Sequence, residues 1–330
     1  MTDPLPDGSE VRLHVVSGKG GTGKTTVAAA LALALAHNGK RVLLCEVEGR
    51  QGIAQVFDVA PLPYEERSVA VASGGGEVFA LAIDPEAALL EYLDMYYRLG
   101  RAGKALDRFG IIDFATTIAP GVRDVLLTGK VYEANRRREK NGEPTYDAIV
   151  VDAPPTGRIA RFLNVNSEVA GLAKVGPIRN QADGIMGMLQ SRHTAVHLVT
   201  VLEDMPVQET IDGIAELRSS DLPVGAVIVN MVRPSPLDEV TRRRVATDGV
   251  DAPAIRKQLE LVGVPAAAGL AEGLLDEARH HVERLALEDE QAGVLKDLDV
   301  PLVELEQLAD GVDLGGLYDL ADALCARGLV

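Results

Sequence analysis

A nine-residue glycine-rich stretch near the N-terminus constrains the fold more than any other part of the sequence. It reads Gly18-Lys19-Gly20-Gly21-Thr22-Gly23-Lys24-Thr25-Thr26 and fits the phosphate-loop pattern, in which four variable residues separate a glycine from Gly-Lys-Ser/Thr. A short apolar run precedes it at residues 11–16, and an alanine- and leucine-rich run follows at 27–34. These flanks predict a buried strand, a tight loop and a helix in succession. The stretch therefore predicts a phosphate-binding loop at the start of a helix.

Each residue type in this loop has a chemical reason to be there. The glycines let the backbone approach a polyphosphate and turn successive N–H groups toward it, and the helix N-terminus adds partial positive charge. The pattern places Lys24 at the β- and γ-phosphates, Thr25 on a Mg²⁺ ion and Thr26 beside the α-phosphate. The predicted nucleotide-binding residues of the loop are Gly20, Gly21, Thr22, Gly23, Lys24, Thr25 and Thr26.

The overall charge argues against a nucleic-acid partner. The 330 residues carry a formal net charge of −16 at pH 7, whereas a nucleic-acid surface needs a basic patch. Two arginine triplets, at 136–138 and 242–244, lie among polar residues, and we interpret them as solvated helix faces or loops. We therefore expect no nucleic acid among the partners.

The cysteines and the apolar runs limit the cellular context. Cys45 and Cys325 lie far apart in the sequence and form neither a disulfide framework nor a C-x-x-C metal clip. The N-terminal segment is acidic and rich in proline, unlike a signal peptide. No apolar run reaches the roughly 20 residues that a membrane span needs. We expect a cytoplasmic protein that does not span a membrane.

Short apolar runs alternate with helical patterns along the chain. Buried strands that alternate with helices are typical of parallel sheets with right-handed crossovers. We therefore predict an α/β fold with a doubly wound, mostly parallel sheet. Beyond the strand at 11–16, the predicted strands lie at 41–46, 77–84, 146–152, 195–202, 224–230 and 300–305.

Three stretches carry only helical patterns, at approximately 85–140, 158–193 and 233–298. We interpret them as insertions that form a helical subdomain over the nucleotide edge of the sheet, within a single domain of residues 1–330. The second stretch contains Met186 and Met188. Methionine suits an adaptable apolar groove, although packing in the core is the more common arrangement.

Polar residues follow three of the predicted strands, at the edge where open α/β sheets bind ligands. Glu46 and Glu48 end one strand, Asp152 ends another and Asn230 ends a third. An aspartate after an apolar strand is typical of the Walker B element, which holds Mg²⁺ directly or through water. The predicted metal ligands are therefore Thr25 and Asp152.

The sequence resembles the family of arsenite-pump (ArsA) ATPases and tail-anchored-protein targeting ATPases, most closely its single-domain members from actinobacteria. These belong to the phosphate-loop NTPases and to the branch defined by an added signature lysine. The likeness runs nearly the whole length of the chain. Its motifs are the loop at 18–26, the strand end near Glu48, the segments 152–158, 161–163 and 203–210, and Asn230.

The resemblance implies a dimer that clamps two ATP molecules with Mg²⁺ and couples hydrolysis to movement of the helical subdomain. It implies that Lys19 acts across the dimer interface on the nucleotide of the partner subunit, and that Asn230 reads adenine. Glu48 stands where the family has an aspartate that orients the attacking water, with Glu46 as a competing candidate. The catalytic residues implied are Lys19, Lys24 and Glu48, and the switch II residues are Asp152, Pro155, Thr156 and Gly157.

Several departures from the family pattern restrict the function. The longer side chain of Glu48 moves the carboxylate away from the position of an aspartate, which disfavours fast hydrolysis unless the backbone shifts. The chain lacks the C-x-x-C clip that joins protomers through zinc and the cysteine cluster that binds arsenite. Arg158 replaces the histidine that commonly follows the Pro-Thr-Gly of switch II.

These observations predict a Mg-ATP-dependent dimeric ATPase switch that serves the transport or targeting of a hydrophobic or membrane-protein client. The partner in the dimer is a second copy or a paralogous subunit, and a further partner is either a hydrophobic protein client or a membrane transport partner. One alternative is a partition or positioning ATPase of the same branch, which would need a basic DNA face or a basic amphipathic helix. Another is an ATP-binding subunit of a heterodimer with weak hydrolysis. A metabolic phosphotransferase or ligase on the same fold also remains open.

Overall fold

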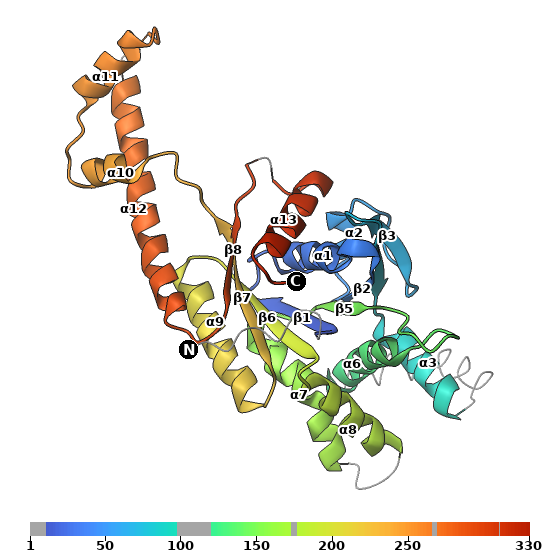
Figure 1. Cartoon of the computed structure of the whole chain (residues 1–330). Helices are drawn as coiled ribbons and strands as arrows, with labels where there is room; N and C mark the ends of the chain where they lie inside the picture. Colours follow the sequence, from blue (N-terminus) through green and yellow to red (C-terminus); the bar gives the residue numbers. More distant parts are fainter. Residues whose placement is uncertain (1–10, 98–119, 173–176, 266–268, 310) are drawn as a thin grey trace.

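A computed structural model describes residues 11–97, 120–172, 177–265, 269–309 and 311–330. An eight-stranded sheet runs through it, with helices on both faces (Figure 1). The strand order is β3-β4-β2-β5-β1-β6-β7-β8, and every neighbouring pair is parallel except the antiparallel pair β3–β4. The fold is therefore α/β with a mostly parallel sheet, which confirms the fold class predicted from the sequence.

The strands fall close to the predicted apolar runs, with one exception. β3 was not predicted, because it is a short edge strand with mostly exposed or half-buried side chains and joins β4 through a glycine-rich turn. The strands are β1 (Leu13–Gly18), β2 (Arg41–Glu46), β3 (Arg67–Val71), β4 (Glu77–Ala82), β5 (Ala148–Asp152), β6 (Thr194–Thr200), β7 (Val224–Val232) and β8 (Leu302–Glu306).

Helices connect the strands and make up most of the described residues in the three stretches that carry helical patterns. Residues 98–119, which belong to the first stretch, lie outside the described residues. The α-helices are α1 (Lys24–Leu35), α2 (Gly52–Val56), α3 (Pro85–Tyr97), α6 (Pro120–Arg136), α7 (Thr156–Leu172), α8 (Pro177–Leu189), α9 (Asp204–Ser219), α10 (Glu239–Ala246), α11 (Ala252–Leu261), α12 (Leu270–Lys296) and α13 (Leu314–Ala326).

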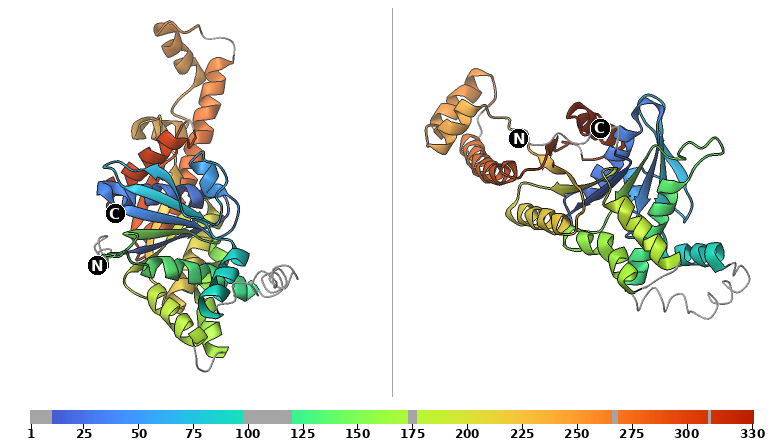
Figure 2. Two further views of the ribbon diagram at one scale, coloured as in Figure 1. Left: turned by 90° about the vertical axis from the view of Figure 1, so that its right-hand side faces the viewer. Right: turned by 60° about the horizontal axis from the view of Figure 1, so that its bottom comes forward.

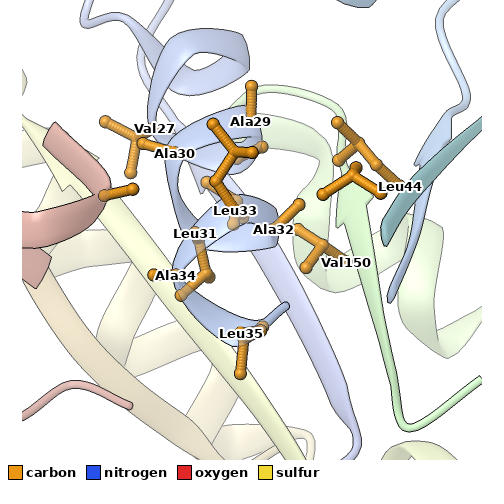
Figure 3. Packing of buried hydrophobic residues seen from close by; sticks show 14 of the residues in the cluster. Val27, Ala29, Ala30, Leu31, Ala32, Leu33, Ala34, Leu35, Leu44 and Val150 are labelled. Atoms are coloured by element: carbon orange, nitrogen blue, oxygen red, sulfur yellow. The ribbon is translucent and has the colours of Figure 1, made fainter. Parts of the chain in front are cut away.

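Two apolar clusters cover the two faces of the sheet. On β2, Val42 and Leu44 belong to the cluster under α1, α2 and α13, whereas Leu43 and Cys45 belong to the cluster under α6 to α9. Helix α1 is buried almost all round, and its alanine and leucine side chains pack beside Leu44 and Val150 (Figure 3). Because α1 follows the phosphate loop directly, this packing fixes the loop against the sheet.

The two methionines of the second helical stretch belong to the core. Met186 is buried in the cluster under α6 to α9, and Met188 packs against the same cluster. Burial of this kind is the common arrangement for methionine. Of the two arrangements considered for these methionines, the structure therefore shows packing in the core.

Helices α10, α11 and α12 form an arm at the β7–β8 end of the sheet. Helix α12 runs away from the sheet, and α11 lies beside its far end (Figures 1 and 2). An ion pair joins Arg256 of α11 to Glu272 of α12 at 2.9 Å. Although α12 spans 27 residues, no helix in the described part of the chain combines the length and apolar character that a membrane crossing requires.

A buried histidine pair lies between the central strands β1 and β6. The rings of His14 and His197 stack with centroids 5.4 Å apart, and each residue is only 2% exposed. The backbone N–H of Ala226 donates to Nδ1 of His197, so Nε2 of His197 carries the proton and donates to Nδ1 of His14 at 3.1 Å. Burial lowers the pKa of His14 to about 4 and that of His197 to about 3. Both rings are therefore neutral at neutral pH.

This pair predicts a loss of stability in mild acid. Below a pH of about 6.5 the unfolded chain protonates both histidines, whereas the folded protein does not until the pH approaches their lowered pKa values. The free energy of unfolding should therefore fall by up to about 1.4 kcal/mol per pH unit for each histidine between pH 6.5 and 4. Urea denaturation at a series of pH values measures this slope.

The variant His14→Val removes one of the two buried titrating rings and should flatten the slope. His280→Gln changes an exposed histidine on α12 and is the matched control, which should keep the wild-type slope. A wild-type slope in His14→Val would mean that other groups, such as carboxylates, cause the acid sensitivity.

Candidate functional site

The phosphate loop leaves β1 and turns tightly into α1. Gly21 and Gly23 have φ angles of 93° and 85°, a left-handed conformation that favours glycine. The backbone N–H and the hydroxyl of Thr22 both donate to the carbonyl oxygen of Lys19, which closes the turn. Helix α1 begins at Lys24, so the N–H groups of its first turn lack acceptors within the helix. The loop therefore offers a set of N–H donors suited to a phosphate chain.

The predicted metal ligands lie in direct contact. The hydroxyl of Thr25 donates to Oδ2 of Asp152 at 2.6 Å, and Asp152 is 8% exposed. Burial raises the pKa of Asp152 to about 6; the hydrogen bond from Thr25 and the charge of Lys24 oppose this shift, and the nearby Glu46 and Glu48 add to it. Negative charge therefore accumulates beside the start of α1, where a cation would relieve it.

These residues fit a Mg²⁺ ion. Oδ1 of Asp152 is buried and has no hydrogen-bond partner, and the hydroxyl of Thr25 adds a second hard oxygen donor next to it. Among the described residues, no three His, Cys, Asp or Glu side chains gather into a group that could hold a metal by themselves. Mg²⁺ commonly takes only one or two protein ligands and completes its shell with phosphate oxygens and water. Thr25 and Asp152 could hold the ion in this way.

The two glutamates that end β2 differ in their surroundings. Glu46 is 2% exposed and accepts hydrogen bonds on both oxygens, from the backbone N–H groups of Gln51 and Ile53. It therefore stabilises the loop that leads into α2. The side chain of Glu48 is 17% exposed and lies 3.6 Å from Arg50. Of the two, Glu48 has the carboxylate that is not taken up by backbone hydrogen bonds.

The turn after β5 is tied to the phosphate loop. The hydroxyl of Ser17, the residue before the loop, donates to the carbonyl oxygen of Pro154 at 2.6 Å. Pro155 is half-buried, Gly157 is exposed, and Thr156 is 2% exposed at the first position of α7. A shift of this turn would therefore act on both the loop and the start of α7.

Lys19 contacts a residue of its own chain. Its ammonium group lies 2.6 Å from Oε1 of Glu209 on α9, and Thr156 donates to Oε2 of the same carboxylate at 3.2 Å. Sequence reasoning gave Glu209 no role, although the residue lies in the segment 203–210 that carries part of the family likeness. No local pattern reveals the contact, because Lys19 and Glu209 are 190 residues apart.

Asn230 lies on β7 against the phosphate loop. Its Nδ2 donates to the carbonyl oxygen of Thr22 at 2.9 Å, and the residue is 5% exposed. A Cβ atom on Gly23 would approach this nitrogen to 2.4 Å, so the contact also requires glycine at that position. Asn230 therefore stabilises the loop. Because its Nδ2 already donates to Thr22, the residue would have to bind an adenine base through Oδ1 or after rotation of the amide.

Helix α6 contacts the loop after β2 and the first turn of α7. Arg123 donates to the carbonyl oxygen of Val47 at 3.4 Å, next to Glu48, and Asp124 lies 3.9 Å from Arg158 at the start of α7. Burial raises the pKa of Asp124, and the nearby arginines oppose this shift. A cavity of about 690 Å³ adjoins these contacts. Arg123 and Asp124 carry no sequence signal, since their importance depends on where α6 packs.

Comparisons with known proteins agree with this geometry. The ArsA ATPase family model, described as "Anion-transporting ATPase", matches residues 11–193. "ATPase BagA" of Mycobacterium tuberculosis is 56% identical over 321 residues, which cover 97% of this chain and 94% of that protein. "ATPase GET3" of Kluyveromyces lactis is 27% identical over 258 residues, with 68% and 73% coverage. The resemblance seen in the sequence is confirmed: the chain belongs to the ArsA family of anion-transporting ATPases, and it is an ATPase.

Proposed function

We propose that this ATPase works as a Mg-ATP-dependent dimeric switch, in which hydrolysis changes the position of the helices over the nucleotide edge of the sheet. One observation carries the proposal. The phosphate loop, the Thr25–Asp152 contact and Glu48 gather at one sheet edge, and α6 contacts both the loop after β2 and the first turn of α7. Any movement of these two segments with nucleotide state would therefore reach α6.

The residues divide the chemistry among them. Lys24 binds the β- and γ-phosphates, while the loop glycines present backbone N–H groups to them. Mg²⁺ held by Thr25 and Asp152 would neutralise charge on the phosphate oxygens. Glu48 orients the attacking water through its carboxylate. Lys19 of one subunit approaches the nucleotide of the partner subunit and stabilises the charge that develops there.

We infer that the client is a hydrophobic or membrane-protein segment. Support comes from exposed apolar side chains near the end of α11 and the start of α12, which would lose their contact with water on binding an apolar segment. Purified protein should bury a tail-anchor peptide in the presence of ATP, as measured by the fluorescence of a dye on the peptide. Absence of binding in every nucleotide state would contradict this part of the proposal. The exposed residues are Leu261, Val262, Val264, Leu270 and Leu274.

Replacing Glu48 by glutamine tests the hydrolytic role. Glutamine keeps the size of the side chain but removes the carboxylate that accepts a proton from water, so kcat should fall by about 10²- to 10⁴-fold. ATP affinity should remain within a few-fold of wild type, because Glu48 does not belong to the phosphate loop. Phosphate release and equilibrium ATP binding measure the two quantities.

Molecular mass in solution, measured with and without ATP, completes the test. Glu65→Gln, in an exposed side chain of a nearby loop, is the matched control and should behave as wild type. If the wild-type protein binds ATP but stays monomeric and does not hydrolyse it, the homodimeric switch is wrong and a paralogous partner is required. Unchanged turnover in Glu48→Gln would remove Glu48 from the mechanism.

A further inference from the structure

Two elements of the site meet at one carboxylate on α9. Oε1 of Glu209 pairs with the ammonium group of Lys19 at 2.6 Å, and Oε2 accepts from the hydroxyl of Thr156 at 3.2 Å. The side chains of Lys19 and Glu209 are 28% and 35% exposed, so the pair is neither fully solvated nor buried. Glu209 therefore joins the phosphate loop to the start of α7.

The helix that carries Glu209 is held firmly in place. Helix α9 buries Val207, Ile214 and Leu217 against the core cluster under α6 to α9. It also passes close to the turn before α7, because a Cβ atom on Gly213 would lie 3.5 Å from the methyl group of Thr156. Glu209 thus lies on a well-packed helix, whereas its two partners lie in the phosphate loop and at the first position of α7.

The contact conflicts with the role that Lys19 has in the proposed dimer. The ammonium group lies 2.6 Å from its own Glu209, and this carboxylate competes with phosphates of the partner subunit for the same positive charge. Transfer of Lys19 to the partner's nucleotide therefore weakens or breaks the contact with Glu209. We propose that Glu209 is a positioning residue that holds Lys19 within its own subunit until ATP-bound subunits meet.

Thr156 provides the link to nucleotide state. It lies four residues after Asp152 and donates to the second oxygen of Glu209. This hydrogen bond fixes the orientation of the carboxylate that holds Lys19. Movement of the turn with nucleotide state would reorient the carboxylate, which couples the hold on Lys19 to the turn that follows Asp152. This inference rests on the proposed ATP-dependent dimer.

The expected effect of Glu209 on dimerisation follows from the exposure of its ion pair with Lys19. Loss of one partly exposed ion pair changes an equilibrium constant by up to about five-fold. Because both subunits release Lys19 on dimerisation, the two effects multiply to as much as about 25-fold. Glu209→Gln removes the negative charge with little change in shape, so ATP-dependent dimerisation should become tighter by about this factor.

The first experiment is a double-mutant cycle on the dimer dissociation constant, measured by analytical ultracentrifugation with saturating Mg-ATP. The proteins are wild type, Glu209→Gln, Lys19→Ala and the double variant. Glu209→Gln should tighten the wild-type dimer and leave the Lys19→Ala dimer unchanged. Glu216→Gln, on an exposed position of the same helix, is the matched control and should have no effect. The proposal would be overturned if Glu209→Gln tightened the dimer equally in the wild-type and Lys19→Ala proteins, or in neither of them.

A second experiment tests the contact in the nucleotide-free protein and does not depend on a dimer. Reductive methylation followed by peptide mass spectrometry gives the reaction rate of Lys19, and Glu209→Gln should raise it several-fold. Exposed Lys257 on α11 serves as the internal reference. If Lys19 reacts at the same rate in both proteins, Glu209 does not hold it, whatever the oligomeric state. If the rate rises but no ATP-dependent dimer forms in any variant, the dimeric switch fails, and with it the role of this contact in dimerisation.

Discussion

Replacing Lys24 by alanine is expected to weaken ATP binding by at least about thirty-fold, because removal of one partner from a buried charge pair costs about 2–5 kcal/mol. Lys24 is 9% exposed and begins α1, and its charge acts on the buried Asp152. No other lysine of the loop replaces it, since Lys19 is paired with Glu209. Isothermal titration with Mg-ATP measures the loss.

Lys40→Ala is the matched control for this variant. Lys40 is exposed just before β2, so its loss should leave ATP affinity unchanged. Unfolding by urea without nucleotide shows whether Lys24→Ala remains folded. Wild-type affinity in a folded Lys24→Ala protein would mean that the loop does not bind the phosphates as proposed.

The parts of the fold that sequence predicts well are those with local causes. The phosphate loop is a contiguous pattern, and the apolar strand β2 was predicted at 41–46 and found at Arg41–Glu46. β3 escaped prediction because its side chains are mostly outside the core and it depends on pairing with β4. Short exposed strands lack the apolar run that identifies buried ones.

The residues of the candidate site also differ in how well the sequence alone predicts them. Sequence placed Asp152 and Asn230 at one edge, because parallel strands bring their carboxyl ends together. It could not separate Glu46 from Glu48, since both follow the same strand and only hydrogen bonds to Gln51 and Ile53 distinguish them. The sequence also could not predict the contact between Lys19 and Glu209, because Glu209 lies 190 residues away, on α9.

Replacing Lys19 by alanine is expected to lower kcat by about 10³-fold or more, the smallest effect of an arginine that a partner protein supplies in other phosphoryl-transfer reactions. ATP affinity of the monomer should change little, because Lys19 points to Glu209 rather than along the phosphate loop. Turnover measured over a range of protein concentrations separates the catalytic loss from weaker dimerisation. Lys257→Ala, on an exposed position of α11, is the matched control.

Mixing two inactive variants distinguishes action across the interface from action within one subunit. Lys19→Ala subunits keep Glu48, and Glu48→Gln subunits keep Lys19. If Lys19 acts on the partner's nucleotide, each mixed dimer contains one complete site, and statistical mixing of equal amounts restores about a quarter of wild-type turnover. If Lys19 acts within its own subunit, no site in the mixture is complete and turnover does not recover. Recovery of turnover would therefore mean that Lys19 leaves Glu209 and crosses the interface. Failure to recover would mean that Lys19 acts on the nucleotide of its own subunit.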